Sequence, residues 1–146
     1  MFKHILIPTD GSPLANRAAK AGIALAGRLG AKVTAYCAIE ELQPIYVEGY
    51  VFSQKELDRF MARAREAGQK RVDAIGKMAK AARVPFAAVV GKAITPYEGI
   101  IAAAKTRKCD VIFMASRGHR GLARLIMGSV TQKVLSHAVI PVVVYH

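Results

Sequence analysis

Short apolar runs recur along the chain and predict β-strands. They cover residues 4–8, 32–39, 86–90, 111–115 and 141–145. The first run, His-Ile-Leu-Ile-Pro, shows little of the polar alternation that marks a strand with one face in water. Strands of this kind are typical of a sheet whose two faces are both covered by helices. The pattern therefore predicts a sheet in the interior of the molecule.

Between these runs, apolar residues recur at helical spacing behind polar starting signals. Ser12-Pro13 supplies an N-cap and a proline at the first helical position, and Gly30 ends the helix that they open. A hydroxyl residue followed three positions later by Glu or Gln is the capping-box pattern. This pattern occurs at Ser53, Thr95 and Ser129, so each is expected to cap a helix.

The helix opened by Ser53 is expected to be the longest, and Pro85 forbids its continuation. Many of the chain's charged residues lie in its pattern, between Lys55 and Arg83, and are interpreted as a solvated helix face. An apolar stripe along the same helix is expected to face the core. Its members are Leu57, Phe60, Ala64, Ala67, Val72, Ile75, Met78 and Ala82.

Strand and helix patterns alternate as β-α-β-α-β-α-β-α-β. This order predicts an α/β fold, a single doubly wound parallel sheet with helices on both faces and right-handed crossovers. No linker or internal repeat interrupts it, so residues 1–146 are expected to form one domain. Ligands of such sheets bind beyond the C-terminal strand ends, where the strand order reverses. The candidate ends are Pro8-Thr9-Asp10, Cys37-Ala38, Gly91 and Ala115–Gly118.

Composition narrows the possible classes of protein. Hydrophobic residues make up 53% of the chain and charged residues 22%, which favours a folded protein over a disordered one. No apolar run approaches the roughly 20 residues that span a bilayer. The two cysteines form no disulfide framework and share no metal-ligand spacing with the histidines. We expect a cytoplasmic protein without a membrane partner and without a His/Cys metal centre.

The net charge of +12 favours a polyanionic partner. A nucleic acid is the least favoured of these partners, because the chain has neither a recognised nucleic-acid-binding motif nor a basic patch interleaved with aromatic residues.

A basic loop with glycines, residues 116–121, follows the fourth predicted strand, and the next helix begins near Gly128-Ser129. Glycines before a helix N-terminus let backbone N–H groups approach a phosphate. The loop is neither a Walker A sequence nor G-x-G-x-x-G. On spacing alone, Gly118 and Gly121 could equally serve turns, and Ser129 could simply cap its helix.

Asp10 ends the first strand and has two interpretations. Its carboxylate could hold a ribose hydroxyl or a Mg²⁺ ion that accompanies phosphates, or it could be a turn residue. A hydrolase triad of Ser129, His119 and Asp10 lacks the nucleophile-elbow sequence and is disfavoured. Cys37 and Cys109 are expected to pack as small apolar residues.

These segments together resemble the universal stress proteins. Met114–Tyr145 is similar to the C-terminal signature of that family, and residues 5–12, Ile-Leu-Ile-Pro-Thr-Asp-Gly-Ser, are similar to its first strand and turn. Nucleotide-binding members carry G-x2-G-x9-G-[S/T]. Here Gly118 and Gly128-Ser129 match the later positions of that motif, Ala115 stands at the first glycine, and Gly121 lies inside the nine-residue spacer.

The resemblance implies strand order 3-2-1-4-5, with ATP and Mg²⁺ at the switch point between the first and fourth strands. Thr9 and Asp10 would meet the ribose and phosphate side, with Asp10 as the metal ligand, and the backbone near Cys37 would border the adenine. The remaining implied nucleotide contacts, mostly to the phosphates, are Pro8, Met114, Ala115, Arg117, Gly118, Gly128, Ser129, Val130 and Thr131.

Two functional hypotheses remain open at this point. The first is an ATP-binding stress-response regulator with at most slow hydrolysis, because no residue is an evident general base. The alternative is a nucleotide-free dimeric module that binds another protein. In either case strand 141–145, apolar and placed at the sheet edge by the implied strand order, is expected to pair with a second copy.

Overall fold

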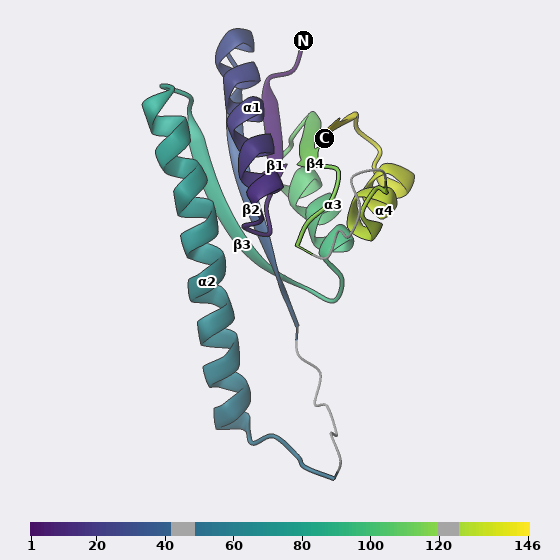
Figure 1. Cartoon of the computed structure of the whole chain (residues 1–146). Coiled ribbons are helices and arrows are strands. Elements are labelled where there is room, and N and C mark those ends of the chain that lie inside the picture. The colour runs from purple at the N-terminus through teal and green to yellow at the C-terminus, as the bar shows by residue number, and fades with distance from the viewer. Residues whose placement is uncertain (42–48, 120–125) are drawn as a thin grey trace.

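A computed structural model describes residues 1–41, 49–119 and 126–146 of the chain. Its elements alternate between strand and helix in the predicted order (Figure 1). They are β1 His4–Pro8, α1 Pro13–Leu29, β2 Lys32–Glu40, α2 Gln54–Ala81, β3 Phe86–Ala93, α3 Pro96–Thr106, β4 Val111–Ala115, α4 Ser129–His137 and β5 Val142–Tyr145.

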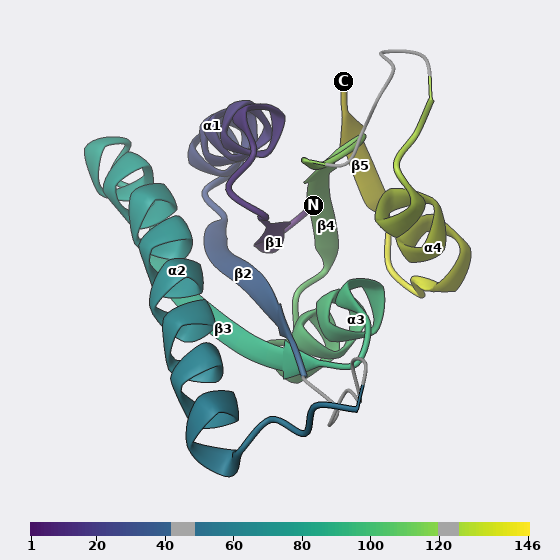
Figure 2. The same cartoon turned by 60° about the horizontal axis from the view of Figure 1, so that its bottom comes forward.

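The five strands form one parallel sheet in the order β3-β2-β1-β4-β5, which confirms the predicted fold class and strand order. Helices α1 and α2 cover one face, and α3 and α4 cover the other (Figure 2). Every residue of the central strands β1 and β4 is buried. Burial on both faces explains why these two runs show no polar alternation.

The helix starts predicted at Ser12 and Ser53 are confirmed. The Ser12 side chain accepts a hydrogen bond from the Ala15 N–H, and Gly30 ends α1 in the left-handed conformation with φ 64°. Ser53 and Glu56 form both halves of the capping box. These local signals succeed because all of their partners lie within one helical turn.

Thr95 is the N-cap residue of α3, as predicted, but its capping box does not form, and the cap predicted at Ser129 is wrong. The Thr95 hydroxyl donates to the Glu98 carboxylate at 2.7 Å and caps no backbone N–H. The N-cap of α4 is Gly128, so Ser129 is the first residue of the helix. The Gln132 side chain donates to the Met127 carbonyl and does not complete a capping box. The helix therefore begins one residue earlier than the spacing predicted, and the Ser129 hydroxyl makes no cap.

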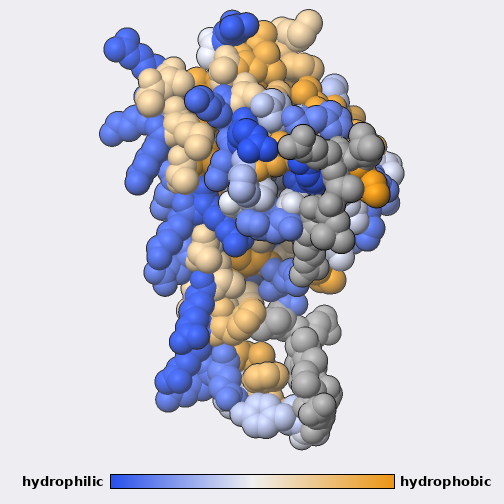
Figure 3. Space-filling view, viewed as in Figure 1, coloured by the Kyte–Doolittle hydropathy of each residue, from blue (hydrophilic) through white to orange (hydrophobic). Residues whose placement is uncertain are grey.

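Helix α2 is longer than the strands on which it packs, and its first turns run past the sheet (Figure 1). Val72 and Ile75 of the predicted stripe are fully buried, whereas Phe60 is 55% exposed. The inward orientation predicted for Phe60, Ala67 and Ala82 is wrong, because all three are exposed. The buried positions of the helix are Gly68, Val72, Ile75 and Ala79. Hydrophilic residues line its outer surface (Figure 3), as expected for a solvated face.

Strand β3 was expected to end at Gly91, yet it continues to Ala93. Its pairing with β2 extends to Glu40 opposite Ala93, and Gly91 lies inside that ladder. A side chain at Gly91 would collide with the Tyr36 ring, so this glycine serves close packing and not a turn. Among the residues described, no helix combines the length and apolar character needed to cross a membrane.

Candidate functional site

The switch point lies between β1 and β4, which pair side by side at the centre of the sheet. The chain leaves β1 toward α1 on one face, and the helix that follows β4 in the sequence, α4, lies on the other face. Because the two connections diverge, the C-terminal ends of these strands are the place where a doubly wound sheet opens a crevice. Residues 8–12 and 115–119 lie at these two strand ends, and the name crevice is used below for this place between them.

Asp10 joins the two sides. One carboxylate oxygen accepts the Ser12 N–H at 2.9 Å, and the other accepts the His119 N–H at 2.9 Å. The His119 ring nitrogen Nε2 lies 3.1 Å from the Asp10 carbonyl oxygen, to which it can donate. Burial opposes ionisation of the carboxyl, but hydrogen bonds from Ser12 and His119 hold the pKa of Asp10 below its ordinary value. Asp10 is therefore an ionised anchor for the loop after β4.

Gly118 lies directly against this anchor. A Cβ atom added at Gly118 would overlap with the Oδ2 atom of Asp10. Its φ is not in the left-handed region, so the glycine is required by space and not by backbone conformation. Asp10 can therefore hold the loop after β4 only because residue 118 has no side chain.

Helix α4 begins where the loop returns to the end of β4. The Gly128 N–H donates to the Ser116 carbonyl at 2.7 Å, and a Cβ at Gly128 would lie 3.1 Å from the Cα of Arg117. Among the described residues no side chain caps the helix, since its N-cap is a glycine, and Ser129 is exposed. A helix start with uncapped N–H groups, a positive dipole end and a free hydroxyl is suited to bind an anion.

Two hydroxyls lie buried behind this helix start. The Thr131 hydroxyl donates to the Ala115 carbonyl at 2.9 Å and fixes α4 to β4. The Ser116 hydroxyl is on a residue only 2% exposed and has no hydrogen-bond partner within the described part of the chain. Because an unpartnered buried hydroxyl is costly, it is a group that a bound ligand or water could satisfy.

Several predicted contact residues can offer only backbone atoms. The Cys37 thiol is buried under α2, and burial raises its pKa. The Met114 side chain packs in the core on the α3 and α4 side, and the Ala115 methyl packs on the α1 and α2 side. Thr9 donates its N–H to the Tyr36 carbonyl and accepts the Gly11 N–H on its hydroxyl.

Pro8 is fully inside the sheet, whereas Arg117 is half-buried and follows Ser116 at the rim of the crevice. Val130 is half-buried in the first turn of α4. The structure thus places every predicted contact residue near the carboxyl ends of β1, β2 and β4 or at the start of α4. Gly121 lies outside the described residues.

Arg71 of α2 is a neighbour of the site that sequence reasoning missed. A Cβ at Gly11 would lie 2.9 Å from the Arg71 Nε, so the arginine side chain crosses directly over Gly11. Its positive charge also favours the thiolate of Cys37 and so opposes in part the rise of that thiol's pKa caused by burial. The pattern placed Arg71 on the solvated face of α2. The glycine at position 11 is the local sign of a turn, and its φ is 78° in the structure. Nothing in the sequence links this turn to a residue 60 positions away.

The residues described contain no group of three or more His, Cys, Asp or Glu side chains that could hold a metal ion. Asp10 is the single carboxylate at the crevice among the predicted contacts, and both of its oxygens already accept backbone N–H groups. Each oxygen keeps a second lone pair. Asp10 can thus serve a Mg²⁺ ion only as one ligand among phosphate oxygens and waters, which is how proteins commonly hold this ion.

Comparison with known proteins places this arrangement in a family. The model of the universal stress protein family matches residues 1–146. The chain belongs to the universal stress protein family. A universal stress protein of Thermus aquaticus, named for its position beside a QAH/OAS sulfhydrylase gene, is 35% identical over 142 residues, which cover 97% of both chains.

Solved structures agree on the fold. The protein MJ0577 superposes with a TM-score of 0.83 at 27% identity, over 99% of this chain and 95% of that one. A universal stress protein solved in complex with cAMP has a TM-score of 0.71 at 20% identity and covers 99% of this chain and 97% of its own. One from Arabidopsis thaliana, solved with AMP bound, reaches 0.64 at 16% identity, with coverage of 97% and 90%.

Proposed function

We propose that this universal stress protein binds ATP in the crevice between β1 and β4. The observation that carries the proposal is the uncapped start of α4 at Gly128-Ser129, held against the end of β4 by the Gly128 N–H. The bound cAMP and AMP of two proteins that share the fold support an adenine nucleotide as the ligand.

In this proposal each side of the crevice has its own task. Backbone N–H groups of Ser129, Val130 and Thr131 and the Ser129 hydroxyl bind the phosphates, with Arg117 and Gly118 opposite. Thr9 and Asp10 face the ribose, and the backbone near Cys37 borders the adenine, with Pro8, Met114 and Ala115 shaping the base of the crevice.

Mg²⁺ enters the proposal together with the phosphates. It would neutralise phosphate charge, with Asp10 as one ligand beside phosphate oxygens and waters. Asp10 suits this role because it is ionised at neutral pH and fixed by the N–H groups of Ser12 and His119.

The protein is proposed to act in the cytoplasm as a nucleotide-dependent regulator, with hydrolysis at most slow. A base for the attacking water must reach it within hydrogen-bonding distance. The lowered pKa of Asp10 makes its carboxylate a weak base, and the His119 Nε2 is engaged with the Asp10 carbonyl, so neither is an effective base for that water. Bound ATP would thus persist long enough to report the nucleotide supply to a partner.

A homodimer through β5 completes the proposal. β5 is the last strand of the sheet and pairs with β4 on one side. The competing hypothesis, a nucleotide-free dimeric module, shares this interface but leaves the crevice without a ligand.

Nucleotide retention separates the two hypotheses. Protein purified without added nucleotide is denatured, and the released small molecules are separated and identified by mass spectrometry. We expect to find adenine nucleotide in the released material. If the nucleotide has been lost during purification, millimolar Mg-ATP should raise the melting temperature, because a ligand that binds the folded state stabilises it. Protein that carries no nucleotide and shows no thermal shift would support the nucleotide-free module.

A further inference from the structure

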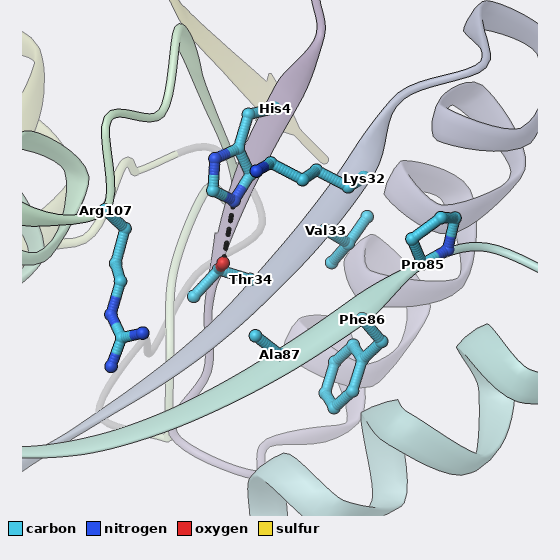
Figure 4. Close-up of a pocket in the computed structure, with 8 residues that line it drawn as sticks. All are labelled: His4, Lys32, Val33, Thr34, Pro85, Phe86, Ala87 and Arg107. Atoms are coloured by element: carbon cyan, nitrogen blue, oxygen red, sulfur yellow. Dashed lines mark hydrogen bonds between the residues drawn. The ribbon is translucent and has the colours of Figure 1, made fainter.

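A pocket lies at the N-terminal ends of the strands, at the opposite end of the sheet from the crevice (Figure 4). It has a volume of about 270 Å³ and is lined by the first residues of β1, β2 and β3 and by Arg107 after α3. The five residues of β1 separate it from the crevice by roughly 13 Å at ~3.3 Å per step. The pocket therefore belongs neither to the proposed nucleotide contacts nor to the dimer edge.

The sheet register explains where the pocket forms. Thr34 pairs with Ala87 and His4 pairs with Lys32 at the N-terminal strand ends. His4 and Thr34 lie on the face of the sheet that α3 and α4 cover, since Leu6 and Tyr36 two positions on are in that core. Ala87 is nevertheless exposed, so the helices leave this corner of the face open.

The charged groups of the pocket are all basic. Lys32 and Arg107 reach it from different elements, and His4 lies between them (Figure 4). Both cations lie close enough to lower the pKa of Cys109, although burial and Asp110 raise that thiol pKa to about 11. Asp110 accepts the N–H groups of Lys3 and His4, and neither Lys32 nor Arg107 forms an ion pair with any described residue.

His4 and Thr34 form a polar pair at the floor of the pocket. The His4 Nε2 lies 2.7 Å from the Thr34 hydroxyl oxygen, and both residues are buried. Burial and then Lys32 lower the pKa of His4, and Asp110 and the carbonyls of Arg107 and Lys108 oppose this only in part. The imidazole is thus neutral at neutral pH. When protonated it must donate to Thr34, which turns the threonine O–H toward another acceptor.

We propose that this pocket binds a small oxyanion, a phosphate or carboxylate group, between Lys32 and Arg107 and over the Thr34 hydroxyl. Two cations without carboxylate partners and a buried hydroxyl are the groups that recognise such an anion. The volume is at the low end for ligand pockets and suits a small molecule. Ala87 and Phe86 add an apolar wall beside the charged groups.

Binding is coupled to protonation of His4. An anion beside the imidazole favours its charged form, and protonated His4 donates to the Thr34 oxygen, which leaves the Thr34 O–H able to donate to the anion. Affinity therefore rises as the pH falls below the ordinary histidine value of about 6.5. By linkage, the bound anion raises the pKa of His4, and the free energy of this shift equals the gain in anion binding on protonation.

Sulfate is the probe that tests this, because its charge does not change between pH 5.5 and 8. The histidine ring signals are followed by NMR across this range with and without sulfate, and His4 is assigned with the His4→Gln variant. Calorimetry measures sulfate affinity for the wild type, for a Lys32→Gln/Arg107→Gln double variant, and for the control Lys105→Gln, an exposed cation of α3 outside the pocket.

We expect sulfate to raise the His4 titration midpoint by at least half a pH unit. We also expect at least tenfold loss of affinity in the double variant and no loss in the control. Phosphate binding more tightly than acetate assigns the site to phosphate groups, and the reverse order assigns it to carboxylates. Equal sulfate affinity in the double variant would place the anion elsewhere, for example in the crevice, and an unmoved His4 signal would also overturn the proposal.

Discussion

Asp10 is the residue on which the crevice depends most. It receives the Ser12 N–H from its own loop and the His119 N–H from the loop after β4, although 109 positions separate Asp10 from His119. A sequence pattern can mark Asp10 as the end of a strand, but not the partner that makes it an anchor. The sequence likewise could not predict the role of Arg71, whose side chain lies over Gly11 although its pattern placed it on the solvated face of α2.

The anchor makes stability depend on pH. The pKa of Asp10 is lowered in the folded state, so its contribution to the free energy of unfolding is complete above its unfolded value and is lost as the pH falls through the folded one. Urea unfolding between pH 3 and 6 should show this loss below about pH 4. The Asp10→Asn variant should show a smaller loss. Identical pH profiles for the two proteins would contradict the anchoring role.

Ala115 stands where the family motif has its first glycine, and its methyl packs in the core on the α1 and α2 side. Ala115→Gly should therefore leave ATP affinity unchanged. It should lower the free energy of unfolding by about 1–2 kcal/mol, because a buried methyl is lost and the unfolded chain gains freedom. Calorimetry and urea unfolding check both effects. Tighter ATP binding in the variant would show that the methyl crowds the phosphates after all.

At the scale of elements, α4 and α2 show when a local signal suffices. Ser53 and Ser129 both stand three positions before Glu or Gln, yet only Ser53 is an N-cap. The start of α4 is set by a distant contact, the Gly128 N–H on the Ser116 carbonyl at the end of β4. The spacing rule could predict that a helix begins here, but not which residue begins it.

This difference gives a matched pair of variants. Ser129→Ala should weaken ATP binding roughly tenfold, the scale of a hydrogen bond to a charged group, and leave stability unchanged. Ser53→Ala should do the reverse, with about 1 kcal/mol lost from the free energy of unfolding and no change in ATP affinity. Calorimetry and urea unfolding measure the two effects. Unchanged ATP affinity in Ser129→Ala would remove its hydroxyl from the proposed site.

At the scale of the whole molecule, the alternation of apolar runs and helical patterns was enough to predict the parallel sheet, and the family resemblance supplied its strand order. Both depend on features repeated along the chain. The overhang of α2 and the basic pocket at the N-terminal strand ends are different, because they depend on where whole helices and strands end relative to one another. These could not be predicted from local patterns.

The strand order also places β5 at an edge, where we expect it to pair with the β5 of a second copy. Val143→Asp should shift the protein toward monomer, because it places two like charges near the two-fold axis. Val139→Asp is the control, since Val139 is 94% exposed and precedes the strand. Light scattering at micromolar concentration measures the mass. A monomeric wild type, or equal dissociation of both variants, would refute this interface.

The most direct test of the central claim is a calorimetric titration with Mg-ATP of the wild type, of Gly118→Val and of the control Gly27→Val. At Gly27 an added Cβ would meet only an ordinary contact with Val84. A side chain at 118 collides with the Asp10 carboxylate and displaces the loop. The account predicts saturable binding to the wild type and the control, and affinity at least tenfold weaker in Gly118→Val, about 1.4 kcal/mol. A wild-type protein that shows neither heat nor thermal stabilisation at millimolar Mg-ATP would contradict it.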